Sequence, residues 1–385
     1  MRGSLAGAAA IAGIGQTEFS KRSGRSEVQL ACEAVKAALD DAGLSPASVD
    51  GMVSFSVDPH EEIEIAKNLG IGALTFFSRV PHGGGAAAAT VMHAAMAVAT
   101  GAAQVVVCYR ALNERSGLRY GSPALPGASR SPYAPFGLLT PAAFVALHAQ
   151  RYMSTYGITN EDFAAISVVD RAHAARNPQA WFYQRPITFE EHQNSRWIIE
   201  PVLRLLDCCQ ESDGGVAIVV TSAERARELA QPPAVIAAAA QGAADKGEQM
   251  TSYYRADLTG LPEMGVVADN LWRTSGLKPA DIQTAILYDH FTPFVLIQLE
   301  ELGFCGRGEA KDFATVENLS VGGALPVNTN GGMLGEAYIH GMNGIAEGVR
   351  QVRGTSYNQV DNVERVLVTS GTGVPTSALI LTLAD

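Results

Sequence analysis

The sequence predicts an α/β protein built from two similar halves, and three observations support this class. Hydrophobic residues make up 47% of the chain and charged residues 17%, which is typical of a globular protein with a large core. Strand-like and helix-like patterns alternate from the N-terminus onward. Apolar runs of the first half recur in the second half in the same order. Strands separated by helical segments favour parallel pairing through crossover helices.

The N-terminal part of the chain shows the clearest alternation. Short apolar runs bounded by turn residues predict strands, and apolar residues at helical spacing predict helices. The glycine run Gly83–Gly85 opens a small-residue helix that extends to about residue 100. The predicted strands are 8–15, 49–57, 74–80 and 104–109, and the predicted helices before the glycine run are 26–42 and 61–69.

One stretch is long enough to be tested as a membrane span. Residues 80–109 contain no Asp, Glu, Lys or Arg, and a span needs about 20 apolar residues. The stretch nevertheless begins with Pro81, carries His82 and His93, and is rich in Ala and Gly instead of Leu and Ile. We therefore expect a helix enclosed by protein and then a buried strand, with no membrane span.

The middle of the chain breaks the alternation. Residues 112–206 are rich in Pro, Tyr, Arg and His, and they include a turn-rich run over 120–133. We predict an insertion that lies over the core, with a helix over 141–156. A strand over 214–221 then returns to the core pattern, and a linker follows at 231–233.

The second half repeats the pattern of the first. GAAQVVVCYR resembles VERVLVTSGT in place and pattern, and SDGGVAIVVTS resembles VPTSALILTLA, so an internal duplication is expected. This gives an N-terminal half over 1–230, which holds the insertion, and a C-terminal half over 231–385. The predicted strands of the second half are 234–240, 284–289, 363–370 and 377–383, and its predicted helices are 266–275, 291–302 and 334–349.

Charge and cysteine usage exclude several functions. A formal net charge of −11 argues against a nucleic-acid partner. The five cysteines are scattered, so we expect neither a disulfide framework nor a zinc site, and a reducing cytoplasm is the simplest location. The adjacent Cys208 and Cys209 are interpreted as small residues in a tight loop. Phosphate-loop and dinucleotide motifs are absent from the sequence, so we predict no nicotinamide, no metal and no permanently bound cofactor.

Three segments resemble motifs of one family, in the family's own order. LLDCCQESDGGVAIVVTS resembles the segment that closes the first half of thiolases of the sterol-carrier-protein type. LYDHFTPFVLIQLEELGF resembles their His-Asp-Cys-Phe segment, and VNTNGGMLGEAYIHGMNG resembles their Asn-x-x-Gly-Gly…Gly-His-Pro segment. The resemblance spans essentially the whole chain. It implies a thiolase fold, in which duplicated βαβαβαββ halves form a five-layer αβαβα arrangement with a loop-domain insertion in the first half.

The chain departs from this family at both catalytic cysteines. The family's nucleophile falls on His82 or Gly83, in the turn from a strand into the central helix. The second cysteine corresponds to about Ser370 or Gly371. Acyl exchange needs a thiolate to hold the acyl group, so ordinary thiolase chemistry is not expected.

Both catalytic histidines of the family are replaced by tyrosines, Tyr288 and Tyr338. A phenol has an ordinary pKa of about 10, so it is a poor base but a good proton donor to an enolate. Paired tyrosines therefore suit proton transfer without a covalent intermediate. Which tyrosine is the base and which is the acid stays open, and each is also compatible with a structural role.

This combination resembles the lipid-transfer-protein-like steroid aldolases of actinobacteria. The resemblance implies that a 17-hydroxy steroid-20-carboxyl-CoA is cleaved to a 17-ketosteroid and propionyl-CoA, with CoA entering as part of the substrate. It also implies a homodimer through the thiolase core. A small partner subunit of OB-fold and zinc-ribbon type would complete an α2β2 complex.

Other residues are weaker candidates for the site. Backbone N–H groups of Gly83, Gly84 and Gly85 at a helix start could hold the enolate oxygen, and His82 could bind the thioester oxygen or cap a helix. Asp289 and His290 lie beside Tyr288 and could either tune its pKa or serve as outer hydrogen-bond partners. Gly331 and Gly332 could allow the backbone to approach the ligand or neighbouring strands closely. Arg110 and Arg119 could contact the CoA phosphates, although neither is assigned, and His340 could face either the cavity or the surface.

Two other functions remain open. A thiolase-like acyltransferase with an unexpected nucleophile would form an acyl-enzyme. A non-catalytic thiolase-fold scaffold or lipid carrier would bind acyl-CoA without turnover, and it would be indifferent to Tyr288→Phe and Tyr338→Phe.

Overall fold

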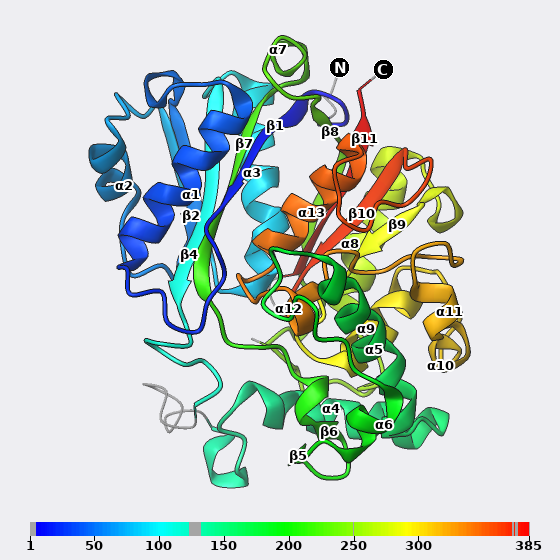
Figure 1. Ribbon diagram of the computed structural model, residues 1–385. Coiled ribbons are helices and arrows are strands. Elements are labelled where there is room, and N and C mark those ends of the chain that lie inside the picture. Colours follow the sequence, from blue (N-terminus) through cyan, green and yellow to red (C-terminus); the bar gives the residue numbers. More distant parts are fainter. Residues whose placement is uncertain (1–4, 123–131, 249, 372, 374–375, 385) are drawn as a thin grey trace.

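The computed structural model describes residues 5–122, 132–248, 250–371, 373 and 376–384. Its core is a mixed sheet with the strand order β3-β2-β4-β7-β1-β8-β11-β10-β9 (Figure 1). The nine strands are β1 (Ala9–Gln16), β2 (Gly51–Phe55), β3 (Phe76–Val80), β4 (Val105–Asn113), β7 (Asp213–Ser222), β8 (Ala234–Gly242), β9 (Thr284–Ile286), β10 (Arg365–Ser370) and β11 (Thr376–Leu383).

The strand order confirms the predicted duplication. Outward from the β1–β8 contact, each half shows two antiparallel pairings and then a parallel one: β1–β7, β7–β4 and β4–β2 on one side, β8–β11, β11–β10 and β10–β9 on the other. β4 therefore corresponds to β10 and β7 to β11, as the sequence repeats indicate. An isolated parallel bridge between Ala285 and Val327 occupies the place that β3 has in the first half.

The parallel pairing expected of strands separated by helices holds for only part of the sheet. β1, β7, β8 and β11 pair antiparallel, and the parallel pairs are β2–β3, β2–β4 and β9–β10. A short connection joins β10 to β11, and a connection of that length can only join antiparallel neighbours. The equivalent connection between β4 and β7 holds the insertion.

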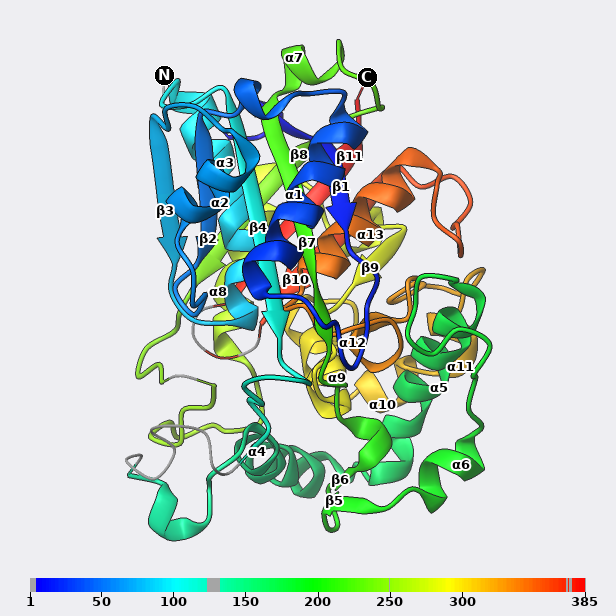
Figure 2. The same cartoon turned by 60° about the vertical axis from the view of Figure 1, so that its left-hand side comes forward.

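Helices form three layers around the two halves of the sheet. β1 and β8 pair only through Ala10–Val235 and Ile11–Ala234, so the two halves can diverge and enclose a central helical layer. α3 contacts strands of both halves, and α13 packs beside it (Figure 2). The layers are an outer one of α1 (Glu27–Ala42) and α2 (Glu62–Leu69), a central one of α3 (Ala87–Thr100) and α13 (Met342–Arg353), and an outer one of α8 (Pro262–Ser275) and α9 (Thr292–Glu301).

Small residues explain why α3 can lie between two sheets. Its buried side chains are mostly alanines, including Ala87, Ala88 and Ala94, so strands approach it from both sides. The uncharged stretch 80–109 thus becomes an enclosed helix followed by β4, as predicted. Within the described part of the chain, no helix has the length and apolar character needed to cross a membrane.

The insertion packs below the sheet and contains more helix than predicted. The helix expected over 141–156 is confirmed as α4 (Pro141–Tyr156). α5 (Asn160–Arg176) was missed because its buried residues include polar ones such as Asp170 and His173, which hide the apolar stripe. The expected turn-rich run 120–133 lies largely outside the described residues. Smaller elements are α6 (Phe189–Asn194), α7 (Ala223–Ala226), α10 (Ala310–Phe313), α11 (Val316–Leu319), α12 (Gly332–Gly335), β5 (Trp197–Ile199) and β6 (Leu203–Arg204).

Two predicted elements of the second half differ from the structure: one helix is interrupted, and one strand ends earlier than expected. The helix expected over 334–349 is divided, because α12 ends at Gly335 and α13 begins only at Met342. His340 and Gly341 adopt φ angles of 50° and 88°, which no helix accommodates. The strand expected over 284–289 ends at Ile286. Both corrections place the two predicted catalytic tyrosines on connections next to the sheet.

Candidate active site

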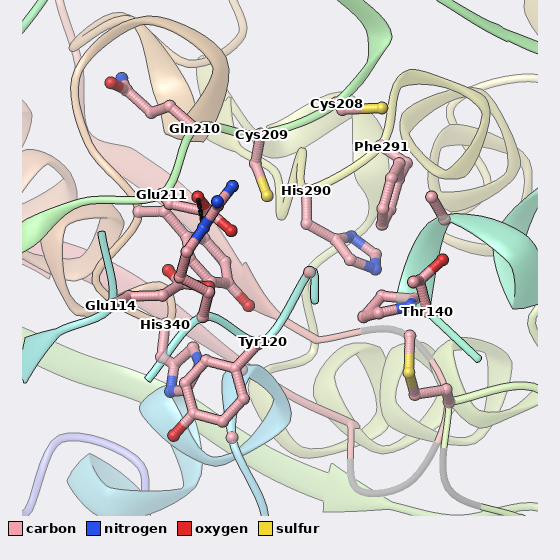
Figure 3. Close-up of a pocket in the computed structure, with 18 of the residues that line it drawn as sticks. Glu114, Tyr120, Thr140, Cys208, Cys209, Gln210, Glu211, His290, Phe291 and His340 are labelled. Atoms are coloured by element: carbon pink, nitrogen blue, oxygen red, sulfur yellow. Dashed lines mark hydrogen bonds and ion pairs between the residues drawn. The ribbon is translucent and has the colours of Figure 1, made fainter. Parts of the chain in front are cut away.

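A cavity of about 510 Å³ lies where several strands end at the same edge of the sheet. Its lining includes the segments that follow β3, β4, β9 and β10, the segment before α13, and residues 205–211 before β7 (Figure 3). The insertion contributes residues near the start of α4. Ligands of open α/β sheets bind beyond the carboxyl ends of the strands, and pockets of about 300–1,000 Å³ are usual for small molecules. Of the predicted site residues, the cavity brings together His82, Gly83, Gly84, Gly85, Tyr288, His290 and Tyr338.

Tyr288 and Tyr338 meet in this cavity. Their hydroxyl oxygens lie 3.0 Å apart, within hydrogen-bond distance. Tyr288 is buried after β9, where its N–H donates to Thr369 Oγ1 at 2.9 Å. Tyr338 is half-buried, and its N–H donates to Ser212 Oγ at 3.1 Å. The backbone of each tyrosine is therefore fixed by the core, and the two phenols point toward each other.

Burial keeps both phenols neutral. It raises the pKa of Tyr288 well above the ordinary value, although the hydrogen bond from Tyr338 opposes the shift. Burial, and after it the charges of Tyr288, Cys209 and Glu114, raises the pKa of Tyr338 well above the ordinary value. A stable phenolate is thus disfavoured at either residue, and the pair suits proton transfer through neutral hydroxyls.

The Tyr288 phenol occupies the space that a side chain at position 84 would need. A Cβ added to Gly84 would lie 1.6 Å from the Tyr288 hydroxyl oxygen. A Cβ at Gly83 would make only tight contacts, 3.0–3.4 Å, with the His340 ring. At this turn into α3, the observed position of the Tyr288 phenol therefore requires glycine at position 84.

Serine hydroxyls already use the N–H groups of the first turn of α3. Ser370 Oγ accepts from the Ala88 N–H at 3.1 Å, and Ser377 Oγ accepts from the Ala89 N–H at 3.0 Å. Ser370, one of the two positions on which the second family cysteine could fall, is thus a structural cap. The N–H groups of Gly83–Gly85, which precede this turn and line the cavity, remain the candidates for holding an oxyanion.

Asp289 and His290 point in different directions from one strand end. The Asp289 carboxylate accepts from the N–H of Met333 at 2.8 Å and of Leu334 at 3.0 Å, so it caps α12 and does not line the cavity. His290 lines the cavity beside Tyr288, with ring centroids 4.9 Å apart. Burial lowers the pKa of His290 to about 3, so its imidazole is neutral.

Gly331 and Gly332 do not line this cavity, which corrects their predicted role in substrate binding. Their φ angles of 105° and 59° favour glycine. A Cβ at Gly331 would lie 2.5 Å from that of Ala174, and one at Gly332 would lie 2.3 Å from an Asp289 oxygen. Both glycines therefore let α12 approach α5 and Asp289. His82, by contrast, lines the cavity with a φ of 68°, and its N–H donates to Ser56 Oγ.

Sequence reasoning missed Glu114. It follows β4, lines the cavity and is 3% exposed, and burial raises its pKa to about 8. Its position directly after a strand is the signal that could have singled it out. Burial also raises the pKa of Cys208 and Cys209, so the two cavity thiols are not activated as thiolates.

Among the described residues, four cationic side chains line the cavity. Arg115, Arg119 and Arg196 line it together with Lys21, whose pKa burial lowers to about 8. Arg119 pairs with Glu211 at 2.7 Å and is half exposed. Arg110, in contrast, is fully buried in an ion pair with Asp58, so it is not placed to meet a phosphate.

Comparison with known proteins places these features in one family. Residues 243–385 match the family described as thiolase C-terminal domain-like. The chain is 67% identical to a steroid side-chain-cleaving aldolase of Thermomonospora curvata, over 98% of each chain. It is 66% identical to the 17-hydroxy-3-oxo-4-pregnene-20-carboxyl-CoA lyase of Mycobacterium tuberculosis, over 98% of this chain and 100% of the lyase. The solved structure of an Ltp2–ChsH2(DUF35) aldolase superposes with a TM-score of 0.94, at 66% identity over 99% of each chain.

Proposed function

Because this chain belongs to the thiolase-fold family of steroid side-chain-cleaving aldolases, we propose that it cleaves a 17-hydroxy steroid-20-carboxyl-CoA to a 17-ketosteroid and propionyl-CoA. The hydrogen-bonded pair of Tyr288 and Tyr338 carries this proposal. The pair stands against the turn where a thiolase would carry its nucleophile, at His82 or Gly83, and the overlap at the neighbouring Gly84 leaves position 84 no space for a side chain.

The retro-aldol step moves one proton from oxygen to carbon. The tertiary hydroxyl gives its proton to one phenol oxygen, that phenol passes its own proton to the second phenol, and the second phenol protonates carbon. As the carbonyl forms on the ring, the carbon–carbon bond breaks, and its electron pair becomes the enolate of the thioester. Protonation of the enolate at its α-carbon gives propionyl-CoA. Because both phenols end neutral, this relay agrees with their raised pKa values.

The alternatives are less well supported by the site. An acyltransferase needs a nucleophile, and the two cavity thiols have raised pKa values. A carrier needs a pocket but no paired proton donors. A carrier does not require two phenol hydroxyls of raised pKa whose oxygens lie 3.0 Å apart, as those of Tyr288 and Tyr338 do.

The first test is product analysis with the chain and its partner subunit. Incubation with a 17-hydroxy steroid-20-carboxyl-CoA is expected to release the 17-ketosteroid and propionyl-CoA in equal amounts, as read by mass spectrometry. Ligand binding without either product would contradict the aldolase and favour a carrier. A trapped acyl-enzyme would favour the acyltransferase.

We further propose a homodimer that carries a small partner subunit of OB-fold and zinc-ribbon type. The name of the similar solved structure joins its aldolase to a DUF35 chain. β3 is the last strand at its edge of the sheet, and Phe77 on it is 68% exposed. An edge strand with an exposed aromatic side chain favours pairing with another chain, so β3 is the proposed dimer edge.

Phe77→Glu is expected to convert the dimer into monomers, because a charge at a paired edge opposes association. Light scattering coupled to size-exclusion chromatography measures the mass. Phe189→Glu, on α6 and 51% exposed, is the matched control and should leave the mass unchanged. A dimer that persists in Phe77→Glu would rule out this edge.

Three further predictions are retained as proposals. The boundary between the halves lies near residue 231, since β8 begins at Ala234. The location is cytoplasmic, which agrees with five free cysteines. No permanently bound cofactor or metal is proposed, because CoA arrives as part of the substrate.

A further inference from the structure

The hydrogen bond between Arg110 and His340 fixes the tautomer of a histidine in the cavity. Arg110 Nε–H donates to His340 Nδ1 at 3.1 Å. A guanidinium has no acceptor, so Nδ1 must carry the lone pair. The ring proton therefore lies on Nε2, and protonation of Nδ1 would place two donors face to face. Burial, followed by the charge of Arg110, accordingly lowers the pKa of His340 well below the ordinary value.

Arg110 is itself held rigidly. Its guanidinium pairs with Asp58, and neither side chain is more than 1% exposed. It also donates to the Ala111 carbonyl at 3.2 Å and lies 5.5 Å from the centroid of the Phe55 ring. Asp58 in turn accepts from the Phe55 N–H at 3.0 Å. A buried ion pair of this kind is costly, and one use for that cost is to hold a neighbouring group in a single orientation.

The His340 ring lines the cavity beside the turn into α3. A Cβ at Gly83 would lie 3.0 Å from His340 Cε1, 3.2 Å from Nε2 and 3.4 Å from Nδ1, so the face of the ring packs against the turn into α3. The ring packs at 82° to Tyr338, with centroids 5.1 Å apart, and lies beside Tyr120 (Figure 3). Nε2–H thus stands at the same turn that lies against the Tyr288 hydroxyl.

We propose that His340 is a catalytic residue whose Nε2–H donates a hydrogen bond to the thioester oxygen as it becomes an enolate, and that Arg110 and Asp58 are positioning residues for it. This inference rests on the proposed function and adds the group that holds the developing negative charge. By the resemblance, the family's histidine falls on Tyr338, so His340 supplies this donor from a different place in the chain.

The chemistry favours a neutral donor here. A preorganised donor aimed at developing charge stabilises the transition state most in a site with little water. A neutral imidazole can polarise a carbonyl that becomes an enolate without protonating it fully, as other enolising enzymes show. The hydrogen bond from Arg110 enforces this neutral form, and the N–H groups of Gly83–Gly85 can complete the set of donors.

Two substitutions separate donation from packing. His340→Gln keeps a donor near the Nε2 position, whereas His340→Phe keeps a ring and removes the donor. With the partner subunit present, His340→Phe is expected to lower kcat for steroid cleavage by about 10²–10³-fold with little change in KM. His340→Gln is expected to recover most of that loss. Equal kcat values for His340→Phe and wild type would overturn the proposal.

A second reaction tests enolate stabilisation without the steroid. Propionyl-CoA in deuterium oxide should exchange its α-hydrogens on the wild-type enzyme, and His340→Phe should slow this exchange as strongly as it slows cleavage. Slower cleavage with unchanged exchange would also overturn the proposal. If wild type exchanges propionyl-CoA but cleaves no steroid thioester, the proposed function fails and the assignment of His340 stands.

A spectroscopic measurement avoids any folding defect of a variant. Nitrogen-15 spectra of the enzyme with labelled histidine, assigned by the loss of one signal in His340→Gln, should show a protonated Nε2 and a bare Nδ1. The signal should not titrate between about pH 5 and pH 8. A ring that titrates in this range, or a proton on Nδ1, would contradict the inference.

Discussion

Tyr288→Phe and Tyr338→Phe are each expected to lower kcat for steroid cleavage by about 10²–10⁴-fold, the usual range for loss of a general acid or base. Each variant breaks the relay at the 3.0 Å contact between the hydroxyl oxygens. KM should change little, because the ring that contacts the ligand remains. Since the phenols act as a unit, the double variant should be no worse than about the worse single variant. Steady-state kinetics with the partner subunit present measures all three.

The matched control is Tyr156→Phe. It removes a phenol hydroxyl that contacts Thr259 at 3.4 Å outside the cavity, so kcat should stay near that of wild type. Wild-type activity in either Tyr288→Phe or Tyr338→Phe would refute the relay and favour a different proton donor, such as Glu114. Loss of activity in the control as well would point to a general effect on folding.

The same pair predicts a pH profile. Because burial raises the pKa of both phenols, no phenolate forms near neutral pH, and kcat should not rise through this range as it would with a phenolate base of lowered pKa. A rise of kcat near neutral pH that disappears in Tyr338→Phe would show that Tyr338 acts as a preformed phenolate.

Sequence reasoning predicted the tyrosine pair and several residues that line the same cavity, but not the buried ion pair beside it. Tyr288 and Tyr338 were found because each stands in a motif of fixed order, and 50 residues separate them along the chain. Arg110 was one of two arginines considered, without assignment, as partners of CoA phosphates, whereas it is buried against Asp58, 52 residues earlier in the sequence. A buried ion pair depends on two chain segments that meet only in the folded sheet, so neither residue alone carries its signal. The role of His340 depends on that pair and was equally hidden.

The fold shows the same limit at the level of elements. The two halves and the insertion were predicted because their strands are short apolar runs that repeat. The helix expected over 334–349 failed because its apolar spacing is helical, while His340 and Gly341 adopt left-handed backbone angles. That break turns Tyr338 and His340 into the cavity. The local helical propensity of this segment is therefore overridden at the residues that form the site.

Gly84→Ala is expected to lower kcat at least as strongly as Tyr288→Phe, by about 10²-fold or more. The φ of Gly84 is not among the positive ones, so alanine is not excluded by the backbone. The added Cβ, however, would stand 1.6 Å from the Tyr288 hydroxyl oxygen and must displace that phenol from Tyr338. Kinetics and the thermal unfolding midpoint, measured together, separate displacement from unfolding.

Gly83→Ala is the matched control, because its Cβ would meet the His340 ring at 3.0–3.4 Å without overlap. It should lower kcat less than Gly84→Ala does, at a similar unfolding midpoint. Full activity in Gly84→Ala would mean that Tyr288 need not stand where it does, which would remove the geometric basis of the relay. Loss confined to Gly84→Ala would instead show that a side chain at position 84 and the phenol of Tyr288 exclude each other. In a thiolase-fold chain with this tyrosine, position 84 would then have to be glycine, directly after the two positions, 82 and 83, on one of which the family's nucleophile falls.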